Sequence, residues 1–311
     1  MLLISLFVFI AGFASADSFG TGENQFEIDF VNISGDAGDL GSWSAGGDYT
    51  FSGVNHGDYR MGKFEITNDQ WSKFQAAYGT VTGSPSYAYD TPPHWTGTNV
   101  PTTGVSWYEG AQFINWLNTS TGHQAAYKFT GTQGSGDYTL SVWDVTETDG
   151  TNLYRHKDAH YFMPTEDEWI KAAYWNGTSL QTWASTGDAV PTQSGWNFYV
   201  NGGYATDPYG PWNVGSGSEE LNGTFDMMGN VCEWMESPYV SENYLPGSDR
   251  GVRGGSYNNF NQLAHGLGSS HRMVFSARSE FNIVGFRVAS VPEPATLSLL
   301  ALGGLLLRKR K

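Results

Sequence analysis

Abundant glycine is the feature of this sequence that most limits what the chain can fold into. Forty of the 311 residues are glycine, whereas an average protein contains about 7%. Because glycine favours turns and weakens helices and strands, we expect short elements joined by long loops. Aromatic residues make up 15% of the chain and supply large apolar surfaces for a core. The sequence predicts a loop-rich, aromatic-rich fold of an extracellular type.

Charge and cysteine content exclude several classes of protein. Lys and Arg total 16 against 31 Asp and Glu, so the net charge is −15. We expect no nucleic-acid partner, because neutralising phosphates requires cations. A single cysteine, Cys232, permits neither an internal disulfide nor a multi-thiolate zinc or iron–sulfur site. Packing, or hard metal ions held by oxygen atoms, must therefore stabilise the fold.

The N-terminal segment has the pattern of an export signal. Residues 1–16 read MLLISLFVFIAGFASA, an apolar run that ends in the small-x-small form of a signal peptidase site. The usual positive residues near the start are missing. We expect residues 1–16 to be a signal peptide, and a buried N-terminal strand is the alternative.

The C-terminal segment, residues 291–311, has three parts. Val291-Pro292-Glu293-Pro294 is followed by an apolar stretch of 13 residues, 295–307, and by the basic run 308–311. As a helix the stretch spans about 20 Å, against a hydrocarbon core of about 30 Å. This tail resembles the bacterial PEP-CTERM sorting signal. The resemblance implies brief anchoring in the inner membrane, cleavage by an exosortase, and delivery to the envelope or extracellular matrix. An ordinary tail anchor is the alternative.

Three short helices are predicted from capping boxes, in which Ser or Thr precedes Glu or Gln by three residues. The first begins after Thr67 and runs to about Ala77, with aromatic residues on one face. The second begins after Ser106 and ends before Gly122. The third begins after Thr165 and runs to about residue 175.

Strands are predicted where apolar and polar residues alternate. They fall at residues 26–31, 59–64, 252–257 and 285–289, with a hairpin of 126–130 and 138–145 inserted before the third helix. Residues 177–222 show little periodicity, and so long a loop needs a functional or metal-binding reason. No repeat or linker divides residues 17–290, so we expect one domain.

Six motifs occur in the order found in the formylglycine-generating, sulfatase-modifying enzyme family, over residues 59–289. The resemblance implies an α+β, C-type-lectin-like fold with short helices, small antiparallel sheets and long Gly-rich loops. The motifs are Met61-Gly62-Lys63-Phe64-Glu65-Ile66-Thr67-Asn68, Pro101 to Trp107, Met163-Pro164-Thr165-Glu166-Asp167-Glu168-Trp169, Phe225 to Trp234, Arg253-Gly254-Gly255-Ser256, and Gly285-Phe286-Arg287.

The cysteine pair of the active members of this family is missing here. In those members two cysteines five residues apart bind copper and activate oxygen, and soft thiolates suit Cu(I). The matched positions hold Ser270 and Phe275, so we expect no catalytic residues and no copper. Cys232 itself is interpreted either as a free thiol or copper ligand, or as a small apolar residue that fills an aromatic site.

Calcium is the metal that the sequence supports. It takes six to eight oxygen ligands and suits irregular loops, and Asp226 and Glu233 bracket a glycine-containing turn. A capped turn with solvated acids is the alternative. The resemblance implies one calcium on the Asp226 and Glu233 side chains with the Gly229 and Val231 carbonyls. It implies a second calcium on these residues: Asn197, Phe198, Asp207 and Tyr209.

The sequence leaves two classes of function open. One is an exported, non-catalytic, calcium-stabilised binding or structural protein of the cell surface or matrix. Its expected partners are signal peptidase and exosortase for processing, and an extracellular polysaccharide or a surface protein as ligand, because Trp and Tyr suit stacking on sugars. The alternative is a divergent copper- or iron-dependent oxidase related to formylglycine-generating enzyme.

Overall fold

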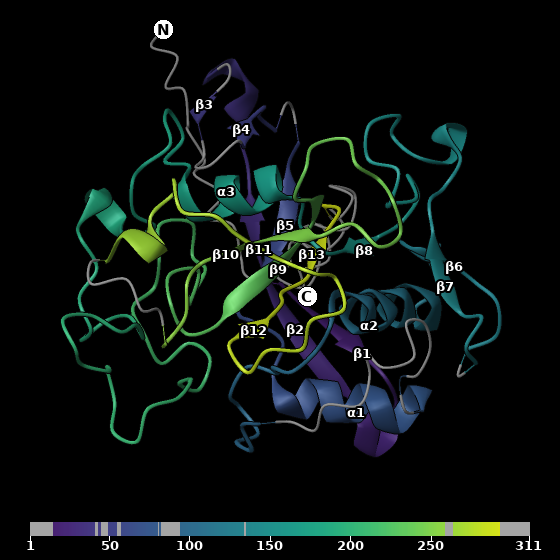
Figure 1. The fold of residues 1–311 in the computed structure, drawn as a ribbon, viewed down its shortest axis with the longest axis horizontal. Coiled ribbons are helices and arrows are strands. Elements are labelled where there is room, and N and C mark those ends of the chain that lie inside the picture. Colours follow the sequence, from purple (N-terminus) through teal and green to yellow (C-terminus); the bar gives the residue numbers. More distant parts are fainter. Residues whose placement is uncertain are drawn as a thin grey trace, which may run out of the picture.

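The computed structural model describes residues 15–292 except 41–42, 45–48, 55–56, 80, 82–93, 134 and 259–263. Residues 1–14 of the predicted signal peptide and residues 293–311 of the predicted tail lie outside the described residues. The strands and helices (Figure 1) are, in chain order, β1 (Ser15–Phe19), β2 (Phe26–Ile33), β3 (Trp43–Ser44), β4 (Thr50–Phe51), β5 (Tyr59–Gly62), α1 (Asn68–Tyr78), α2 (Trp107–Ser120), β6 (Lys128–Thr130), β7 (Thr139–Ser141), β8 (Tyr161–Phe162), α3 (Glu166–Tyr174), β9 (Cys232–Pro238), β10 (Arg250–Arg253), β11 (Met273–Phe275), β12 (Val284–Gly285) and β13 (Ala289–Ser290).

The three helices begin where the capping boxes predict. Thr67, Ser106 and Thr165 each accept a hydrogen bond from the backbone N–H three residues later, and the Gln or Glu at that position binds back. Such reciprocal bonds satisfy donors that a helix N-terminus leaves free. In Figure 1, α3 lies on one side of the central strands, and α1 and α2 lie on the other.

A five-stranded sheet joins the two ends of the domain. Its strand order is β1-β2-β5-β13-β8, and all its neighbours are antiparallel. Ser15 and Ala16, the last two residues of the predicted signal peptide, are the first residues of β1 and pair with β2. The predicted strand at residues 26–31 is β2, with alternating buried and exposed residues.

A four-stranded sheet of order β11-β10-β9-β12 packs beside the first. The single strand predicted at residues 285–289 is wrong. Residues 284–285 form β12 in this sheet, and residues 289–290 form β13 in the other. Between them Arg287 reaches the buried Glu233, which requires the chain to leave one sheet for the other.

The core divides into two apolar clusters. The larger one packs α1 and α2 against aromatic residues of β1, β2 and the segment at Phe286. The smaller one surrounds α3 and includes Met61 of β5 and Met235 of β9. The long segment 177–222, predicted without a helix, contains only a short 3-10 helix at residues 186–188. Its loops carry the candidate ligands of the second predicted calcium, and the turn that follows, 226–233, carries those of the first.

Candidate functional site

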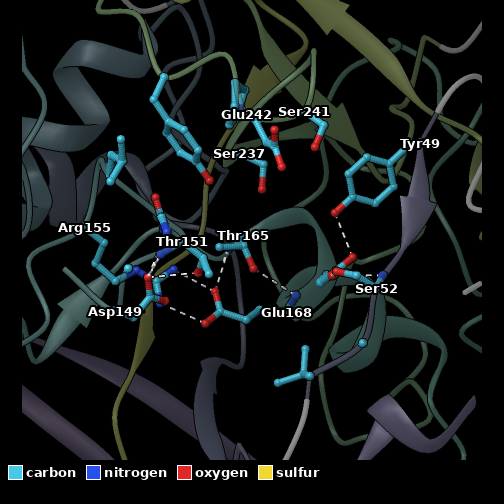
Figure 2. A pocket seen from close by; sticks show the side chains of 18 of the residues that line it. Tyr49, Ser52, Asp149, Thr151, Arg155, Thr165, Glu168, Ser237, Ser241 and Glu242 are labelled. Atoms are coloured by element: carbon cyan, nitrogen blue, oxygen red, sulfur yellow. Dashed lines mark hydrogen bonds and ion pairs between the residues drawn. The ribbon is translucent and has the colours of Figure 1, made fainter. Parts of the chain in front are cut away.

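An open cleft of about 990 Å³ lies between segments that are far apart in the sequence (Figure 2). One wall is the β4 segment with Tyr49 and Ser52. The facing wall comes from the chain after β9, with Ser241 and Glu242, and α3 contributes residues at its N-terminus. The remaining wall is the stretch 149–155. Most of the lining residues carry hydroxyl, amide or carboxylate groups, and apolar surface lies between them.

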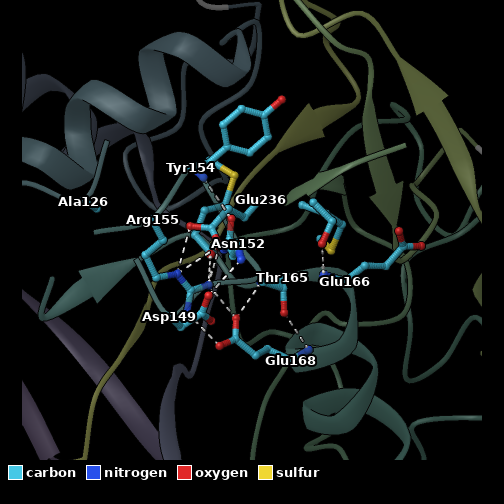
Figure 3. A network of polar contacts seen from close by, with 12 residues as sticks. Ala126, Asp149, Asn152, Tyr154, Arg155, Thr165, Glu166, Glu168 and Glu236 are labelled. Atoms are coloured by element: carbon cyan, nitrogen blue, oxygen red, sulfur yellow. Dashed lines mark hydrogen bonds and ion pairs between the residues drawn. The ribbon is translucent and has the colours of Figure 1, made fainter. Parts of the chain in front are cut away.

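The floor of the cleft is fixed by Arg155, which lies between two carboxylates in Figure 3. Its guanidinium donates to Glu168 at 2.8 Å and to Glu236 at 2.6 Å, and it stacks 3.6 Å from the Phe162 ring centroid. Burial opposes ionisation of Glu168, but Arg155 outweighs it and lowers the pKa of that carboxyl. The floor is a rigid, charge-paired platform.

Further bonds hold the Glu236 carboxylate in this floor. Tyr127 donates its hydroxyl to Glu236 at 2.8 Å, and the Asn152 amide donates to the other oxygen. Glu236 is fully buried. Because each of its oxygens has partners, the carboxylate is held in place and serves to orient the cleft rather than to meet a ligand.

The wall at Tyr49 is held by Asp167 at the start of α3. Tyr49 donates its hydroxyl to Asp167 at 2.7 Å, and the Ser52 backbone N–H and hydroxyl donate to the other oxygen. Burial raises the pKa of Asp167, and these three bonds oppose the shift. The bonds connect the β3–β4 hairpin to the N-terminal end of α3, where a carboxylate is favoured by the helix dipole.

Glu166 turns away from the cleft and binds two arginines beneath it. Arg253 Nε is 2.7 Å and Arg272 Nε is 2.8 Å from Glu166 Oε1, and all three side chains are buried. The Arg272 guanidinium also stacks over Tyr49 and Tyr239. This ion triplet ties α3 to β10 and to the segment before β11.

Four more carboxylates form a second buried group, which includes the predicted calcium ligands Asp226 and Glu233. Glu65 and Glu220 join them, and all four are at most 5% exposed. Glu233 binds Arg287 at 2.5 Å and accepts from the Trp169 indole at 2.8 Å. Within the described residues, Arg287 is the one cation that forms an ion pair with this group.

The pKa values of three carboxyls in this group are raised, chiefly by burial. Burial raises the pKa of Asp226 to about 6. Burial, with the nearby Asp226, raises the pKa of Glu220 to about 8. Burial and the charges of Asp226 and Glu233 raise the pKa of Glu65. Buried carboxylates in such excess need either protons or a cation.

The two segments predicted to bind calcium lie against each other. The Asn230 backbone N–H donates to Asn197 O at 2.8 Å, and the Asn197 amide donates to Gly210 O at 2.9 Å. Gly229 has a φ of +90°, and a Cβ there would lie 2.4 Å from Asn197 O. Glycine is therefore required at this crossing. The structure brings Asn197 to the 207–210 loop and to the Asp226–Glu233 turn.

Other predicted ligands are less enclosed. Asp207 and Tyr209 lie on the exposed part of the loop, and the Tyr209 ring stacks on Tyr204 at 4.7 Å. The Phe198 carbonyl accepts from the Gln193 amide at 2.7 Å. Over the residues with described placement, no three His, Cys, Asp or Glu side chains are arranged to hold a metal ion.

The Asp226 and Glu233 carboxylates are the kind of donor that calcium takes, although both Glu233 oxygens already accept hydrogen bonds from Arg287, and one of them also from the Trp169 indole. The donors are oxygen atoms of carboxylates and of a glycine-containing turn, which is the set that calcium prefers. The buried group has more carboxyl groups than the one arginine that pairs with it, and burial raises the pKa of Asp226. Of the two predicted sites, this one has the stronger physical basis.

The positions of the family's cysteine pair lie apart from the cleft lining. Ser270 is exposed in the turn before β11, and Phe275 in β11 packs on Phe281 at 4.8 Å. Cys232 is 1% exposed inside the larger core cluster, and burial raises the pKa of its thiol to about 12. At neutral pH this thiol is protonated, which agrees with a packing role.

Sequence reasoning missed the residues that build the cleft floor. Arg155, Asn152 and Glu236 belong to segments that contact each other only in the folded chain. The available signal was weak: Arg155 is one of only 16 basic residues in the chain. A basic residue in an acidic, aromatic protein is a candidate for a buried ion pair.

The architecture is the α+β, C-type-lectin-like fold of formylglycine-generating enzyme. The chain belongs to the sulfatase-modifying factor enzyme 1-like domain family, which it matches over residues 29–291. This match begins before the predicted start at residue 59, because β2 is part of the domain. Residues 290–311 match the PEP-CTERM protein-sorting motif. That motif is a signal for export to the cell envelope and for processing by exosortase.

Individual relatives are distant in sequence. Chaperone protein LppX of Paenibacillus barcinonensis is 26% identical over 247 residues, 74% of this chain and 79% of that protein. Among solved structures, CarF has a TM-score of 0.62 at 22% identity, covering 86% of this chain and 99% of its own. Treponema denticola variable protein 1 has a TM-score of 0.60 at 19% identity, covering 89% and 99%. None of the helices formed by the described residues is both long and apolar enough to cross a membrane.

Proposed function

We propose that this chain is a non-catalytic binding protein of the bacterial surface or extracellular matrix, stabilised by calcium. The observation that carries the proposal is the loss of both copper-binding cysteines from a domain that retains its fold and a large cleft. Signal peptidase and exosortase process the chain, and the tail anchors it in the inner membrane until it is cut. LppX, a relative with the same domain, is named a chaperone, which is also a binding role.

The absence of the cysteine pair argues against the family's oxidase chemistry. Two thiolates are needed to hold Cu(I), and a serine hydroxyl is a poor ligand for a soft metal. Phe275 offers no donor atom. Cys232 supplies one sulfur, and its thiol is buried and protonated. The chain has no second cysteine, so the copper site of the active members cannot form.

The cleft supports a polyhydroxylated ligand, such as a neutral polysaccharide. Its lining combines hydroxyl groups, for example Ser241 and Thr151, with the rings of Tyr49 and Tyr244. Hydroxyl and carboxylate groups bind sugar hydroxyls, and aromatic rings stack on sugar faces. The acids Asp149, Asp167, Glu168 and Glu242 outnumber Arg155 in the lining. That charge balance disfavours anionic ligands.

Calcium in this proposal is structural. The Asp226 and Glu233 side chains with the Gly229 and Val231 carbonyls would hold one ion, and bound calcium would supply positive charge to the buried acids. The second ion would take Asn197, Phe198, Asp207 and Tyr209. The loops 197–210 and 226–233 would then be fixed without disulfides. The 226–233 loop contacts α3 through the bond between Trp169 and Glu233, and α3 forms part of the cleft.

A glycan-binding assay tests the cleft. The purified protein is applied to an array of bacterial polysaccharides, and hits are quantified by calorimetry. Ser241→Arg places a long cationic side chain in the cleft, and we expect at least a tenfold loss of affinity. Val240→Arg is the matched control, because Val240 is exposed and does not line the cleft. Equal affinities for the two variants would contradict this ligand site.

An oxidase assay tests the non-catalytic role. Copper-loaded protein is incubated with oxygen, a thiol and a Cys-x-Pro-x-Arg peptide, and aldehyde is measured by mass spectrometry. We expect no turnover. Turnover that Cys232→Ser abolishes would refute the proposal and establish a single-thiol form of the chemistry.

A further inference from the structure

The first strand of the domain begins, and the last strand ends, at the same end of the five-stranded sheet. β1 is parallel in direction to β5, and β13 is antiparallel to β5 in the same sheet. The chain before Ser15 and the chain after Ser290 therefore leave from one end of the sheet. The start of β8 at Tyr161 lies at this end, since Tyr161 pairs with Ser290. We call it the Arg60 end.

Arg60 connects the two departing segments at this end. Its guanidinium binds the Asp17 carboxylate at 2.9 and 2.6 Å, and its Nε donates to Val291 O at 3.4 Å. Arg60 is 2% exposed, and Tyr161 also donates its hydroxyl to Asp17 at 2.8 Å. Asp17 is the residue that follows the predicted signal peptidase site. The cluster would therefore persist after that cut.

Little chain separates this end from either apolar segment. The apolar N-terminal run continues directly into Ser15. On the other side the Val291 backbone N–H is bound to His160 O at 3.0 Å, so the chain is fixed as far as Val291. The apolar stretch begins at Ala295. Three residues separate Val291 from Ala295, and these four steps of chain span at most about 14 Å.

We propose that the Arg60 end is a membrane-contact surface, which the chain presses against the lipid bilayer while the sorting tail is still attached. This inference rests on the export and anchoring proposed above. The tail is too short to let the body move away from the bilayer, and the fixed Val291 sets which side faces it. The surface includes Asp158 in the turn before β8 and the small cavity lined by Asp58, Lys157 and Pro292.

A lipid surface is favoured over contact with exosortase alone. The limited reach from Val291 to the apolar stretch holds whether or not the enzyme is present. The two apolar segments also leave from the same end, so insertion of either one brings the same surface to the bilayer. Contact with exosortase would need a specific binding surface on the domain, whereas contact with the bilayer follows from the short tail alone.

The test uses the full chain in inner-membrane vesicles from cells that lack exosortase. Asp158→Cys places a nitroxide label at the Arg60 end, where Asp158 is 69% exposed. Glu23→Cys is the matched control, because Glu23 is an exposed acid in the turn between β1 and β2 at the opposite end of the sheet. The eight residues of β2 separate the ends by about 25 Å. Buried Cys232 is left unlabelled.

Relaxation of each label by nickel-chelating lipid reports its distance from the headgroups. We expect at least a threefold larger effect at position 158 than at position 23. A second chain with ten Gly and Ser residues inserted after Pro292 should lose most of this difference, because the body can then rotate and withdraw. Retained asymmetry with the linker would show that something other than the short tether orients the body.

The remaining outcomes overturn the inference in distinguishable ways. Equal effects at the two positions in membrane-bound protein would refute the contact surface but leave export intact. An asymmetry that occurs only in vesicles with exosortase would identify the enzyme as the partner and refute the bilayer. Recovery of the unprocessed chain in the soluble fraction would refute the anchoring on which the inference rests.

Discussion

The two buried groups of carboxylates differ in how their charge is balanced. Around α3, Glu166, Glu168 and Glu236 meet three arginines within ion-pair distance. Around the 226–233 turn, four carboxylates meet one arginine, Arg287. The second group is buried, so solvent cannot balance its charge, whereas Arg155 and Glu168 of the first group are 17% and 14% exposed at the cleft. The first group is complete as the chain makes it, whereas the second needs a further cation or protons.

The α3 group is therefore a fixed scaffold, whereas the charge of the group around the 226–233 turn depends on bound cations and on pH. The α3 group holds the cleft whatever ions are present, because its partners are covalently part of the protein. The other group is balanced only when a cation is bound or when some of its carboxyls are protonated. The comparison teaches that burial of acids alone does not identify a metal site. The ratio of acids to arginines shows which of the two groups lacks charge compensation from the protein itself.

Removing Arg155 should produce the largest effect. Arg155→Ala leaves Glu168 and Glu236 buried without their cation, and breaking such a pair costs about 3–5 kcal/mol. Urea unfolding followed by tryptophan fluorescence measures the change. The double variant Arg155→Ala with Glu236→Gln should recover part of the loss. A loss below about 1 kcal/mol for the single variant would show that the α3 group is not a scaffold.

Calcium should give the next largest effect, and only through the second group. At 100 times the dissociation constant, a ligand stabilises the native state by about 2.7 kcal/mol. We expect EDTA to lower the melting temperature of the wild type and to leave Asp226→Ala with Glu233→Ala unchanged. Differential scanning calorimetry with calcium or EDTA measures both. Full calcium response in the double variant would contradict the assigned ligands.

The smallest loss of stability is expected in the second group, and a matched pair of substitutions, Glu220→Gln and Glu168→Gln, measures it against the first group. In calcium-free protein at pH 7, the raised pKa of Glu220, about 8, keeps its carboxyl mostly protonated. Glu220→Gln removes little charge and should cost under about 1 kcal/mol. Glu168→Gln removes a charge that Arg155 stabilises and should cost about 2–3 kcal/mol. Equal losses in chemical unfolding would erase the distinction between the groups.

Local structure was predictable because its causes are local. Capping boxes at Thr67, Ser106 and Thr165 gave the helix starts, since the bonds involve residues three apart. The hairpin of β6 and β7 also lies inside its predicted segments. Short strands such as β8 and β13 were missed or merged. Two residues carry no periodic pattern, and pairing with distant strands defines them.

The candidate site was predictable only in part. The turn from Asp226 to Glu233 is continuous, so its acids could be found from spacing. Glu65 joins them through Asn230 and the Val231 backbone, contacts that sequence spacing cannot give. The cleft is assembled from four separate segments, and only one of them, at Thr165 to Glu168, lies in a motif found in the sequence. The arginines that neutralise its acids come from β10 and from loops.

The position of β13 has a consequence for the order in which the chain folds. β13 lies between β5 and β8 and pairs Ala289 with both Met61 and Phe162. Its residues are among the last of the domain to be synthesised. Contacts between such distant residues form slowly, because a long loop must close first. Until β13 arrives, β5 and β8 have unpaired edges that can bind other chains. A nascent or partly exported chain is therefore aggregation-prone, and the sheet closes only when the sorting tail is next to emerge.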